Sequence, residues 1–349
     1  MRIGILTGGG DCPGLNAVIR AVVLTGEAVF ADDAVGFLDG WKGLLENHAE
    51  PLSVERCRDI MPTGGTILGT SRTNPFGRDD GVEKVLSTVA DRGIDALVAI
   101  GGEDTLGVAD RLGEHGVRVV GVPKTIDNDL SGTEVTFGFD TAVQIATDAI
   151  DRLRTTAESH HRVIVCEVMG RHAGWIATYA GLAGGAAEIL VPEVPFDLDD
   201  VCERLVRRHA GGQFSSIVVI SEGAVPAAGA DQSSARGATA SDSVDPFGHA
   251  RLGGIGTWLA EELESRTGFE ARVTTLGHVQ RGGTPTAFDR VLATRFGVAA
   301  VHALHDGAFG TMVALQAGEI VRIPIGAAVA EAKTVDLALY RDVAGVFLG

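Results

Sequence analysis

A buried-strand pattern, a glycine-rich loop and a helical pattern follow one another in both halves of the chain. In the first half, Ile3–Leu6 leads into Thr7–Gly14 and then into a helical pattern from Leu15 to about Phe30. In the second half, Arg162–Met169 leads into Gly170–Gly174 and another helix. Short apolar runs that end in glycine and continue as helices are typical of α/β folds. The repetition predicts two similar doubly wound domains.

Length and charge narrow the class of protein. A chain of 349 residues favours two domains over a single core. The formal net charge of −17 argues against nucleic acid or an anionic membrane surface as a partner, because either would need a basic field. The cysteines form no CxxC pair, and no apolar run approaches the roughly 18 residues of a membrane span, so we expect a cytoplasmic protein.

The segment PKTIDNDL, residues 123–130, follows a buried-strand pattern at Val117–Val122. Pro123 cannot donate to a strand ladder, which favours a strand end there. A cation, a hydroxyl and two carboxylates then follow at Lys124, Thr125, Asp127 and Asp129. One carboxylate in such a segment can accept a proton from a bound hydroxyl while the other positions a ligand. A polar loop with turn-forming Asp and Asn is the alternative interpretation.

A second polar segment, GGEDT at 101–105, lies between the apolar run Ala96–Ile100 and a helical pattern at Leu106–Leu112. Adjacent glycines let a ligand approach the backbone, and a helix N-terminus favours an anion. Glu103 and Asp104 would repel a phosphate there unless a divalent cation lay between them. The segment therefore predicts Mg²⁺, which binds one or two carboxylates and completes its shell with water and phosphate.

The glycine loop Gly8–Gly10 is a candidate phosphate site, although both standard fingerprints fail. A P-loop would have Lys where Leu15 stands, and a dinucleotide fingerprint would have glycine where Pro13 stands. A tight turn is the alternative. Arg72 lies in a Gly/Thr/Ser loop, where a guanidinium can bind two phosphate oxygens, although a loop arginine is more often solvated surface.

These segments belong to a longer series of motifs, which reads GGEDT, PKTIDNDL, MGRHAGW, SEG and LGHVQRGGTP in this order. The series resembles that of the phosphofructokinase family, in which a phosphoryl group is transferred to the C1 hydroxyl of fructose 6-phosphate. The resemblance extends from the first strand to about residue 345. It implies two Rossmann-like domains with the active site in the cleft between them, fructose 6-phosphate as substrate and Mg²⁺ as cofactor.

The resemblance also implies roles for individual residues. Asp127 would accept the proton of the C1 hydroxyl, and Glu103, which stands where the family commonly has Asp, would hold the metal. The implied catalytic residues are Asp127, Arg171, Thr125, Asp104 and Lys124. The implied donor contacts are Gly10, Arg72, Asp104 and Lys124. The implied substrate contacts are Thr125, Ile126, Asp127, Asp129, Arg162, Met169, Gly170, Arg171, Glu222, Arg272, His278, Val279, Gln280 and Arg281.

Three of the cations follow a predicted strand that begins at Ala271. Arg272, His278 and Arg281 would form a cluster at the end of this strand, suited to the 6-phosphate of a sugar. Arg162 and Arg272 match positions that reach the sugar phosphate of a neighbouring subunit in relatives. The resemblance therefore implies a homodimer or homotetramer.

The identity of the phosphoryl donor depends on residues 104 and 124. ATP-using relatives keep a glycine where this chain has Asp104. Pyrophosphate-using relatives have Asp there, together with a lysine at the position of Lys124 that some ATP-using members share. A carboxylate near the α-phosphate of a nucleotide costs about 4 kcal/mol per close charge pair at an effective dielectric of 20, or about a thousandfold in affinity. We therefore expect pyrophosphate as the donor, with ATP as the alternative.

Domain boundaries follow from the same patterns. We expect a phosphoryl-donor and Mg²⁺ domain at 1–139 and 280–330, and a fructose 6-phosphate domain at 140–279 and 331–349. Residues 226–250 are rich in Ala, Gly, Ser and Asp and lack periodicity, which predicts a surface insertion. Helices are predicted at 136–154, 251–265, 288–305 and 334–343.

Two other functions are alternatives to phosphoryl transfer to fructose 6-phosphate. Lipid and NAD kinases share a GGDGT-like loop, but MGRHAGW and LGHVQRGGTP argue against both. A catalytically inactive sugar-phosphate sensor is the alternative from a different class. The intact Asp127, Arg171 and Glu103 argue against it.

Overall fold

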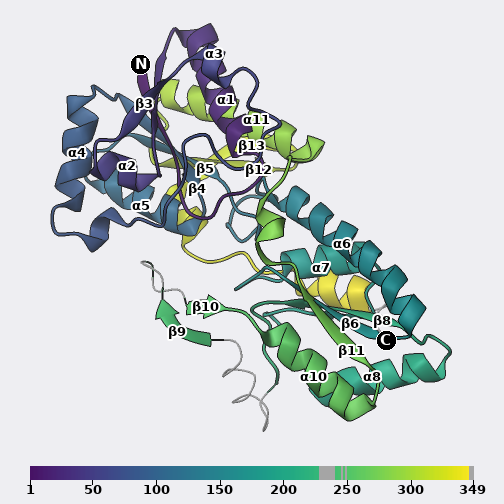
Figure 1. Ribbon diagram of the computed structural model, residues 1–349. Coiled ribbons are helices and arrows are strands. Elements are labelled where there is room, and N and C mark those ends of the chain that lie inside the picture. The colour runs from purple at the N-terminus through teal and green to yellow at the C-terminus, as the bar shows by residue number, and fades with distance from the viewer. Residues whose placement is uncertain (228–239, 245–246, 248–249, 346–349) are drawn as a thin grey trace. The chain divides into compact units, whose positions relative to one another are not determined.

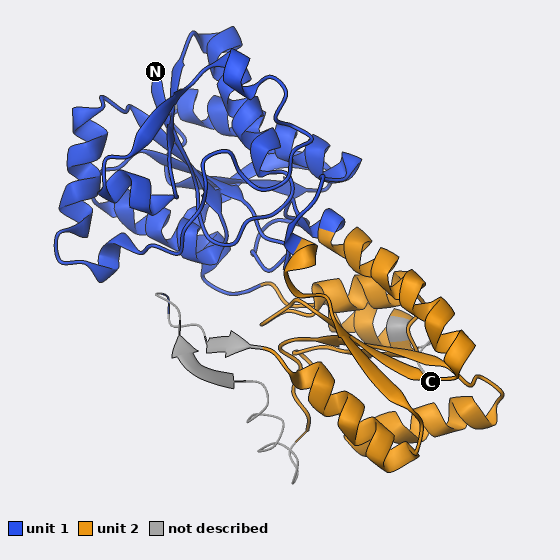
Figure 2. Cartoon of the chain, in the orientation of Figure 1, with its two compact units in different colours: residues 1–141, 245–248, 281–332 blue, residues 142–244, 249–280, 333–349 orange. Residues whose placement is uncertain are grey.

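The computed structural model describes residues 1–227, 240–244, 247 and 250–345, and it divides into two compact units (Figure 2). Unit 1 is formed mainly by 1–141 and 281–332, and unit 2 mainly by 142–244, 249–280 and 333–349. The boundaries expected from the sequence differ from these by one or two residues. In the described ranges, no helix is long and apolar enough to cross a membrane.

A seven-stranded sheet lies at the centre of unit 1, in the order β13-β12-β5-β4-β1-β2-β3 (Figure 1). Its strands are β1 (Arg2–Thr7), β2 (Asp33–Phe37), β3 (Ala49–Leu52), β4 (Ala96–Gly101), β5 (Val119–Pro123), β12 (Thr311–Gln316) and β13 (Glu319–Pro324). The five central strands are parallel, and β3 and β13 pair antiparallel at the two edges. Every residue of β4 is buried, which explains its uninterrupted apolar sequence.

Helices cover both faces of this sheet. They are α1 (Leu15–Thr25) with a π-helical turn η1 (Gly26–Phe30), α2 (Trp41–Leu45), α3 (Val54–Cys57), a 3₁₀ turn η2 (Pro75–Gly77), α4 (Gly81–Asp91), α5 (Glu103–Glu114), α11 (Ala287–His305) and α12 (Ile325–Val329). Buried residues of α2, α4, α5 and α12 form one hydrophobic core with the strands. Helices α1 and α11 pack against each other, and α11 also contacts β5 and β12. This layering is the doubly wound arrangement expected from the sequence.

Unit 2 contains a parallel four-stranded sheet in the order β11-β6-β8-β7 (Figure 1). The strands are β6 (Val163–Val168), β7 (Glu188–Leu190), β8 (Ser216–Ser221) and β11 (Ala271–Thr275), and β11 leads into a 3₁₀ turn η3 (Gly277–Arg281). The helices are α6 (Phe139–His160), α7 (Trp175–Ala183), α8 (Leu198–Ala210) and α10 (Ile255–Thr267), with a π-helical turn η4 at Leu339–Ala344. Buried residues of α8 and α10 form a core with β6, β8 and β11.

Four expected elements differ from the structure. Helix α6 was expected at 136–154 but begins at Phe139 and ends at His160. Helix α10 begins at Ile255 rather than at Arg251, because Arg251 belongs to strand β10 (Ala250–Leu252). The C-terminal helical segment begins at Leu337 and includes the turn η4, so residues 334–336 are not helical. Much of the insertion predicted at 226–250 lies outside the described residues, but its described part includes β9 (Ala240–Val244), which pairs antiparallel with β10.

The topology of unit 1 indicates where a ligand binds. From β1 the chain proceeds to β2 on one side, and later returns to β4 and β5 on the other side. The loops after β1 and β4 therefore leave the sheet at a topological switch point, where open α/β sheets bind their ligands at the carboxyl ends of the strands.

Candidate active site

Three loops of unit 1 follow the carboxyl ends of the adjacent strands β1, β4 and β5. Backbone hydrogen bonds connect them: Gly8 N donates to Ile100 O over 3.0 Å, and Lys124 N donates to Gly101 O over 2.9 Å. The parallel register therefore gathers the glycine loop, GGEDT and PKTIDNDL at one edge of the sheet. Segments that are about 20 to 115 residues apart in the sequence thus form one surface.

Lys124 is a buried cation within this surface. Its side chain is only 4% exposed, and its ammonium donates a hydrogen bond to the carbonyl oxygen of Gly10. Burial lowers the pKa of Lys124, while the nearby Asp11 and Asp127 act in the opposite direction and raise it. The lysine therefore brings a desolvated ammonium to the glycine loop.

Arg281 is a second cation at the glycine loop. Its Nη1 donates to Asp11 O over 3.3 Å, and a Cβ atom on Gly10 would lie 2.5 Å from that nitrogen. A side chain at position 10 would thus displace the guanidinium, which gives a physical reason for glycine there. Arg281 also ends the turn η3 that carries His278, so the expected grouping of these two cations stays a prediction.

The segment with Arg72 supports the glycine loop from the other side. Gly9 N donates to Ser71 O over 3.3 Å, and Thr70 Oγ1 donates to Gly9 O over 2.6 Å. Arg72 follows directly and is exposed. Backbone contacts therefore place an accessible guanidinium next to the loop, as a donor contact requires.

In PKTIDNDL, buried and half-buried residues alternate. Ile126, Asn128 and Leu130 are buried, whereas Thr125, Asp127 and Asp129 are half-buried. Thr125 Oγ1 accepts a hydrogen bond of 3.0 Å from Asp127 N, and this contact fixes the backbone of the carboxylate. The two carboxylates and the hydroxyl of the predicted site are thus more accessible than the residues between them.

Asn128 is a supporting residue that the sequence analysis missed. It has a left-handed backbone with φ of 51°, and its Oδ1 accepts a hydrogen bond of 3.1 Å from Thr136 N. Thr136 Oγ1 in turn donates to Thr125 O over 2.7 Å. The available signal was the residue type, because Asn tolerates the left-handed region better than other non-glycine residues.

Glu103 and Asp104 lie in the first turn of α5, with Gly102 as the N-cap residue. Glu103 is exposed and Asp104 is half-buried. The helix dipole favours carboxylates in this position, so a metal ion is not the only reason for their presence. Among the described residues, no group of three or more His, Cys, Asp or Glu side chains could hold a metal ion. A magnesium ion bound here would therefore depend on phosphate and water oxygens for most of its ligands, which is its usual mode of binding.

In unit 2, the loops after β6 and β8 are bonded to each other. Glu222 N donates to Val168 O over 2.9 Å, and Ser221 Oγ donates to Gly170 O over 2.6 Å. Met169 N contacts Gln280 Oε1 at 3.4 Å, which adds the turn after β11. The predicted sugar contacts Met169, Gly170, Arg171, Glu222 and Gln280 thus come from neighbouring segments. His278 and Val279 are exposed on the same turn as the buried Gln280.

Arg162 and Arg272 lie at the opposite end of this sheet. Arg162 immediately precedes β6, and Arg272 is the second residue of β11. Both pair with Glu270, with 2.8 Å between Arg162 Nε and Glu270 Oε2. Because Arg272 is at the start of β11, the expectation that it clusters with His278 at the end of the strand is wrong.

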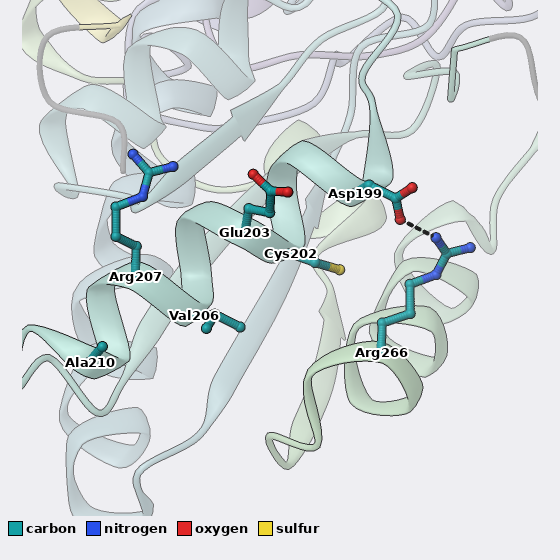
Figure 3. A pocket seen from close by; sticks show the side chains of 7 residues that line it. All are labelled: Asp199, Cys202, Glu203, Val206, Arg207, Ala210 and Arg266. Atoms are coloured by element: carbon teal, nitrogen blue, oxygen red, sulfur yellow. Dashed lines mark hydrogen bonds and ion pairs between the residues drawn. The ribbon is translucent and has the colours of Figure 1, made fainter.

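A surface pocket lies between α8 and α10 (Figure 3). Its lining residues are Asp199, Cys202, Glu203, Val206, Arg207, Ala210 and Arg266. An ion pair of 2.6 Å between Asp199 and Arg266 bridges the two helices. The pocket shares no residue with the loops described above, and its chemistry does not resemble theirs.

Fold and site together define a class of protein. Parallel strands that end in glycine loops, cations and carboxylates are typical of α/β proteins that bind phosphorylated ligands. The family model of phosphofructokinase matches residues 2–304. The chain belongs to the phosphofructokinase family.

Known relatives fall into two groups by name. The pyrophosphate–fructose 6-phosphate 1-phosphotransferase of Streptomyces coelicolor is 59% identical over 350 residues, which cover 100% of both chains. The ATP-dependent 6-phosphofructokinase of Mycobacterium tuberculosis is 53% identical and covers 99% of this chain and 100% of its own. The solved phosphofructokinase from Saccharomyces cerevisiae has a TM-score of 0.82 at 32% identity, covering 94% of this chain and 45% of that chain.

Proposed function

We propose that the protein transfers a phosphoryl group from pyrophosphate to the C1 hydroxyl of fructose 6-phosphate, in a reversible reaction that yields fructose 1,6-bisphosphate and phosphate. The observation that carries the proposal is the carboxylate of Asp104 in the first turn of α5, which follows β4, the strand that pairs with β1. A relative with 59% identity over the full length is named for this reaction.

Asp127 acts as the base for the C1 hydroxyl. Its backbone is fixed by the hydrogen bond to Thr125 Oγ1, and its half-buried side chain belongs to the accessible set of Thr125, Asp127 and Asp129. Thr125 and Asp129 orient the hydroxyl, so that the proton moves to a carboxylate oxygen as the acceptor oxygen attacks. Positioning of this kind is the main requirement of phosphoryl transfer.

Cations at the glycine loop bind the donor. Lys124 and Arg72 offer an ammonium and a guanidinium to the oxygens of pyrophosphate, and the Gly10 backbone allows close approach. Arg171, in unit 2, neutralises charge on the transferred group. Arg281 was predicted as a substrate contact, but its position at Asp11 and Gly10 favours a role with the donor phosphates.

Glu103 is the residue that would hold Mg²⁺. Its exposed carboxylate provides the oxygen ligand that this ion prefers, and the adjacent glycines leave room for phosphate oxygens. When bound, the metal would neutralise charge on the donor oxygens. All the other roles proposed above are performed by residues of the protein itself.

The fructose 6-phosphate contacts come from unit 2. Glu222 accepts hydrogen bonds from the sugar hydroxyls, and Met169, Gly170 and Gln280 complete the wall of this site with His278 and Val279. Arg162 and Arg272 lie at the amino ends of their strands, so they serve the 6-phosphate site of a neighbouring subunit in a homodimer or homotetramer. We place the enzyme in the cytoplasm.

An ATP-dependent reaction is the second candidate, because relatives with 53% identity carry that name. The test is the rate of fructose 1,6-bisphosphate formation by the purified protein with fructose 6-phosphate, Mg²⁺ and either pyrophosphate or ATP. We expect turnover with pyrophosphate. Turnover with ATP alone would overturn the donor assignment, and tight fructose 6-phosphate binding without turnover would identify a sensor instead.

A further inference from the structure

Residues 328–335, which we call the tether, are attached to the end of PKTIDNDL in unit 1. Ser131 N donates to Ala328 O over 3.2 Å, and Ser131 Oγ donates to Glu331 O over 2.8 Å. Leu130 also forms an antiparallel bridge with Ala332. Leu130 and Ser131 directly follow Asp129, so the tether holds the downstream end of the loop that carries the proposed base.

The next residues of the tether are attached to unit 2. Trp175 Nε1 donates to Lys333 O over 3.0 Å, and the Lys333 ammonium lies 5.2 Å from the centre of the Trp175 ring. Val335 N donates to Glu193 Oε1 over 2.8 Å. Trp175 is the first residue of α7, and this helix directly follows the loop that carries Arg171.

Glu193 connects the tether to that loop. Besides Val335 N, its carboxylate accepts Gly174 N at 3.0 Å through Oε1 and at 3.1 Å through Oε2. Gly174 is the N-cap residue of α7, where a carboxylate is favoured by the helix dipole. A Cβ on Gly174 would lie 2.5 Å from Val191 Cβ, so the loop is tightly seated against the segment of Glu193.

The chain between the two sets of contacts is short. The chain leaves unit 1 after Ala332 and enters unit 2 at Lys333. The anchor points at Ala332 and Val335 are three peptide links apart, and each link spans about 3.8 Å. While both sets of hydrogen bonds hold, Ala332 and Val335 can therefore separate by no more than about 11 Å.

We propose that the tether couples the Asp127 loop to the Arg171 loop, and that Glu193 is a positioning residue for Arg171. The proposal rests on the proposed function for the roles of Asp127 and Arg171. The mechanical coupling does not depend on the reaction, because both sets of contacts exist in the protein without substrate. Protein without ligand can therefore test it.

The first experiment is hydrogen–deuterium exchange of the unliganded protein, followed in peptides that cover residues 126–134 and 170–178. Glu193→Ala removes the acceptor for Gly174 and Val335. We expect faster exchange around Gly174 and also around Ser131, roughly tenfold at both places. Ser131→Ala should produce the reciprocal change around Gly174. Faster exchange confined to the mutated side, in both variants, would overturn the coupling.

The second experiment is a kinetic double-mutant cycle with fructose 6-phosphate and pyrophosphate. Glu193→Ala should lower kcat about tenfold with little change in the KM for pyrophosphate, because it misplaces Arg171 without touching the donor loop. Glu193→Gln keeps one oxygen acceptor and should stay within about threefold of wild type. A Gln variant as impaired as the Ala variant would contradict the positioning role.

The double variant separates coupling from two independent defects. If the tether acts as one unit, Ser131→Ala adds almost nothing to the kcat loss of Glu193→Ala. The matched controls are Ser53→Ala and Asp197→Ala, two helix N-cap residues in units 1 and 2 that do not contact the tether, and their effects should multiply. Multiplying effects in the tether pair would overturn the proposal. If wild type shows no turnover, the proposed reaction fails, and the exchange experiment still decides the coupling.

Discussion

At the scale of single residues, the proposed function assigns the choice of phosphoryl donor to position 104. The carboxylate of Asp104 is half-buried in the first turn of α5, which follows β4, the strand that pairs with β1. Its repulsion of a nucleotide phosphate is weaker than in a buried site, because the side chain is partly screened by water. The carboxylate also occupies space that the glycine of ATP-using relatives leaves empty.

Two variants of this residue separate its charge from its size. Asp104→Gly should raise the ratio of kcat/KM for ATP to that for pyrophosphate at least tenfold, since both repulsion and bulk are removed. Asp104→Asn, which keeps the shape, should produce only the electrostatic part. Steady-state kinetics with both donors provide the measurement. An unchanged ratio in Asp104→Gly would mean that the carboxylate does not face the donor.

How well residues could be assigned from sequence depended on what fixes each side chain. Thr125, Asp127 and Asp129 were predicted together, and all three are more accessible than the buried residues between them. Arg272 was predicted with Arg281 at the end of a strand, but Arg272 is the second residue of β11. A nine-residue separation that includes a strand and a turn does not show which end of the strand each residue occupies. The contact of Arg281 with the glycine loop, 270 residues away, leaves no local signal.

At the scale of elements, buried strands and the helices between them could be predicted from the sequence, whereas edge strands and the insertion could not. The buried strands β1, β4, β5 and β6 lie in largely apolar runs and were all predicted. Strand β13 was missed, because an edge strand that is half exposed has a mixed sequence, here EIVRIP. The start of α10 was also misplaced, because the pairing of β10 with β9 leaves no sign in the sequence that the residues of β10 are not helical.

The turn after β6 places Arg171, and it depends on Gly170. The φ of Gly170 is +136°, and a Cβ there would lie 2.5 Å from Ser221 Oγ and 2.6 Å from Ala173 O. Gly170→Ala should lower the free energy of unfolding by about 2–3 kcal/mol and reduce kcat, because the backbone must shift. Gly212→Ala is the control, with a φ of +89° and no atom within 4 Å. Urea unfolding of both variants measures the difference, and equal losses would exclude a role for the clash.

Helices α6 and α11 cap each other at their N-termini. Asp289 of α11 accepts hydrogen bonds from Thr141 N over 2.8 Å and from Thr141 Oγ1 over 2.5 Å. Thr286 N donates to Thr141 Oγ1 over 3.0 Å, and Thr286 Oγ1 donates to Asp140 Oδ2 over 2.6 Å. This interlock anchors the start of α6, the helix that leads from unit 1 into unit 2.

The interlock makes stability depend on pH through Asp289. Burial raises the pKa of its carboxyl to about 6 from the ordinary 3.8, although the Thr141 hydrogen bonds act to lower it. The native state therefore binds a proton that the unfolded chain releases between about pH 4 and 6. As the pH rises through this window, the contribution of Asp289 to the free energy of unfolding falls by up to about 3 kcal/mol.

Asp289→Asn removes this titration. The free energy of unfolding of wild type minus that of Asp289→Asn should therefore decrease by roughly 2–3 kcal/mol between pH 4 and 7, as measured by urea unfolding. Thr141→Val removes a hydrogen bond that lowers the pKa, so the midpoint of the wild-type pH dependence should move upward in that background. A difference that is independent of pH would contradict the buried, protonated carboxyl.

At the scale of the whole molecule, the proposed sugar site is incomplete in one chain. Arg162 precedes β6, whereas Gly170 and Arg171 follow it, and the six residues of β6 span about 20 Å. An arginine side chain cannot cover that distance. The same holds for Arg272 at the start of β11, so the proposed function assigns both cations to the 6-phosphate site of a neighbouring subunit.

Mixed oligomers test this arrangement directly. Asp127→Ala removes the base of its own chain, and Arg162→Ala removes a cation that serves the other chain, so each homo-oligomer should be strongly impaired. In a mixed dimer, the chain that carries Arg162→Ala keeps its own Asp127 and receives Arg162 from its partner, and this one site is intact. Random exchange of equal amounts after gentle dissociation produces about half mixed dimers, so activity should recover to about a quarter of wild type.

The control for this experiment pairs two lesions that each impair the site of their own chain. Asp127→Ala mixed with Arg171→Ala should not recover more activity than the mixture without exchange, because Asp127 and Arg171 serve the same chain and each mixed site retains one lesion. Recovery with Arg162→Ala but not with Arg171→Ala would establish a shared site. If neither mixture recovers activity although mass measurements verify subunit exchange, Arg162 does not serve the neighbouring site. Its role would then be the ion pair with Glu270.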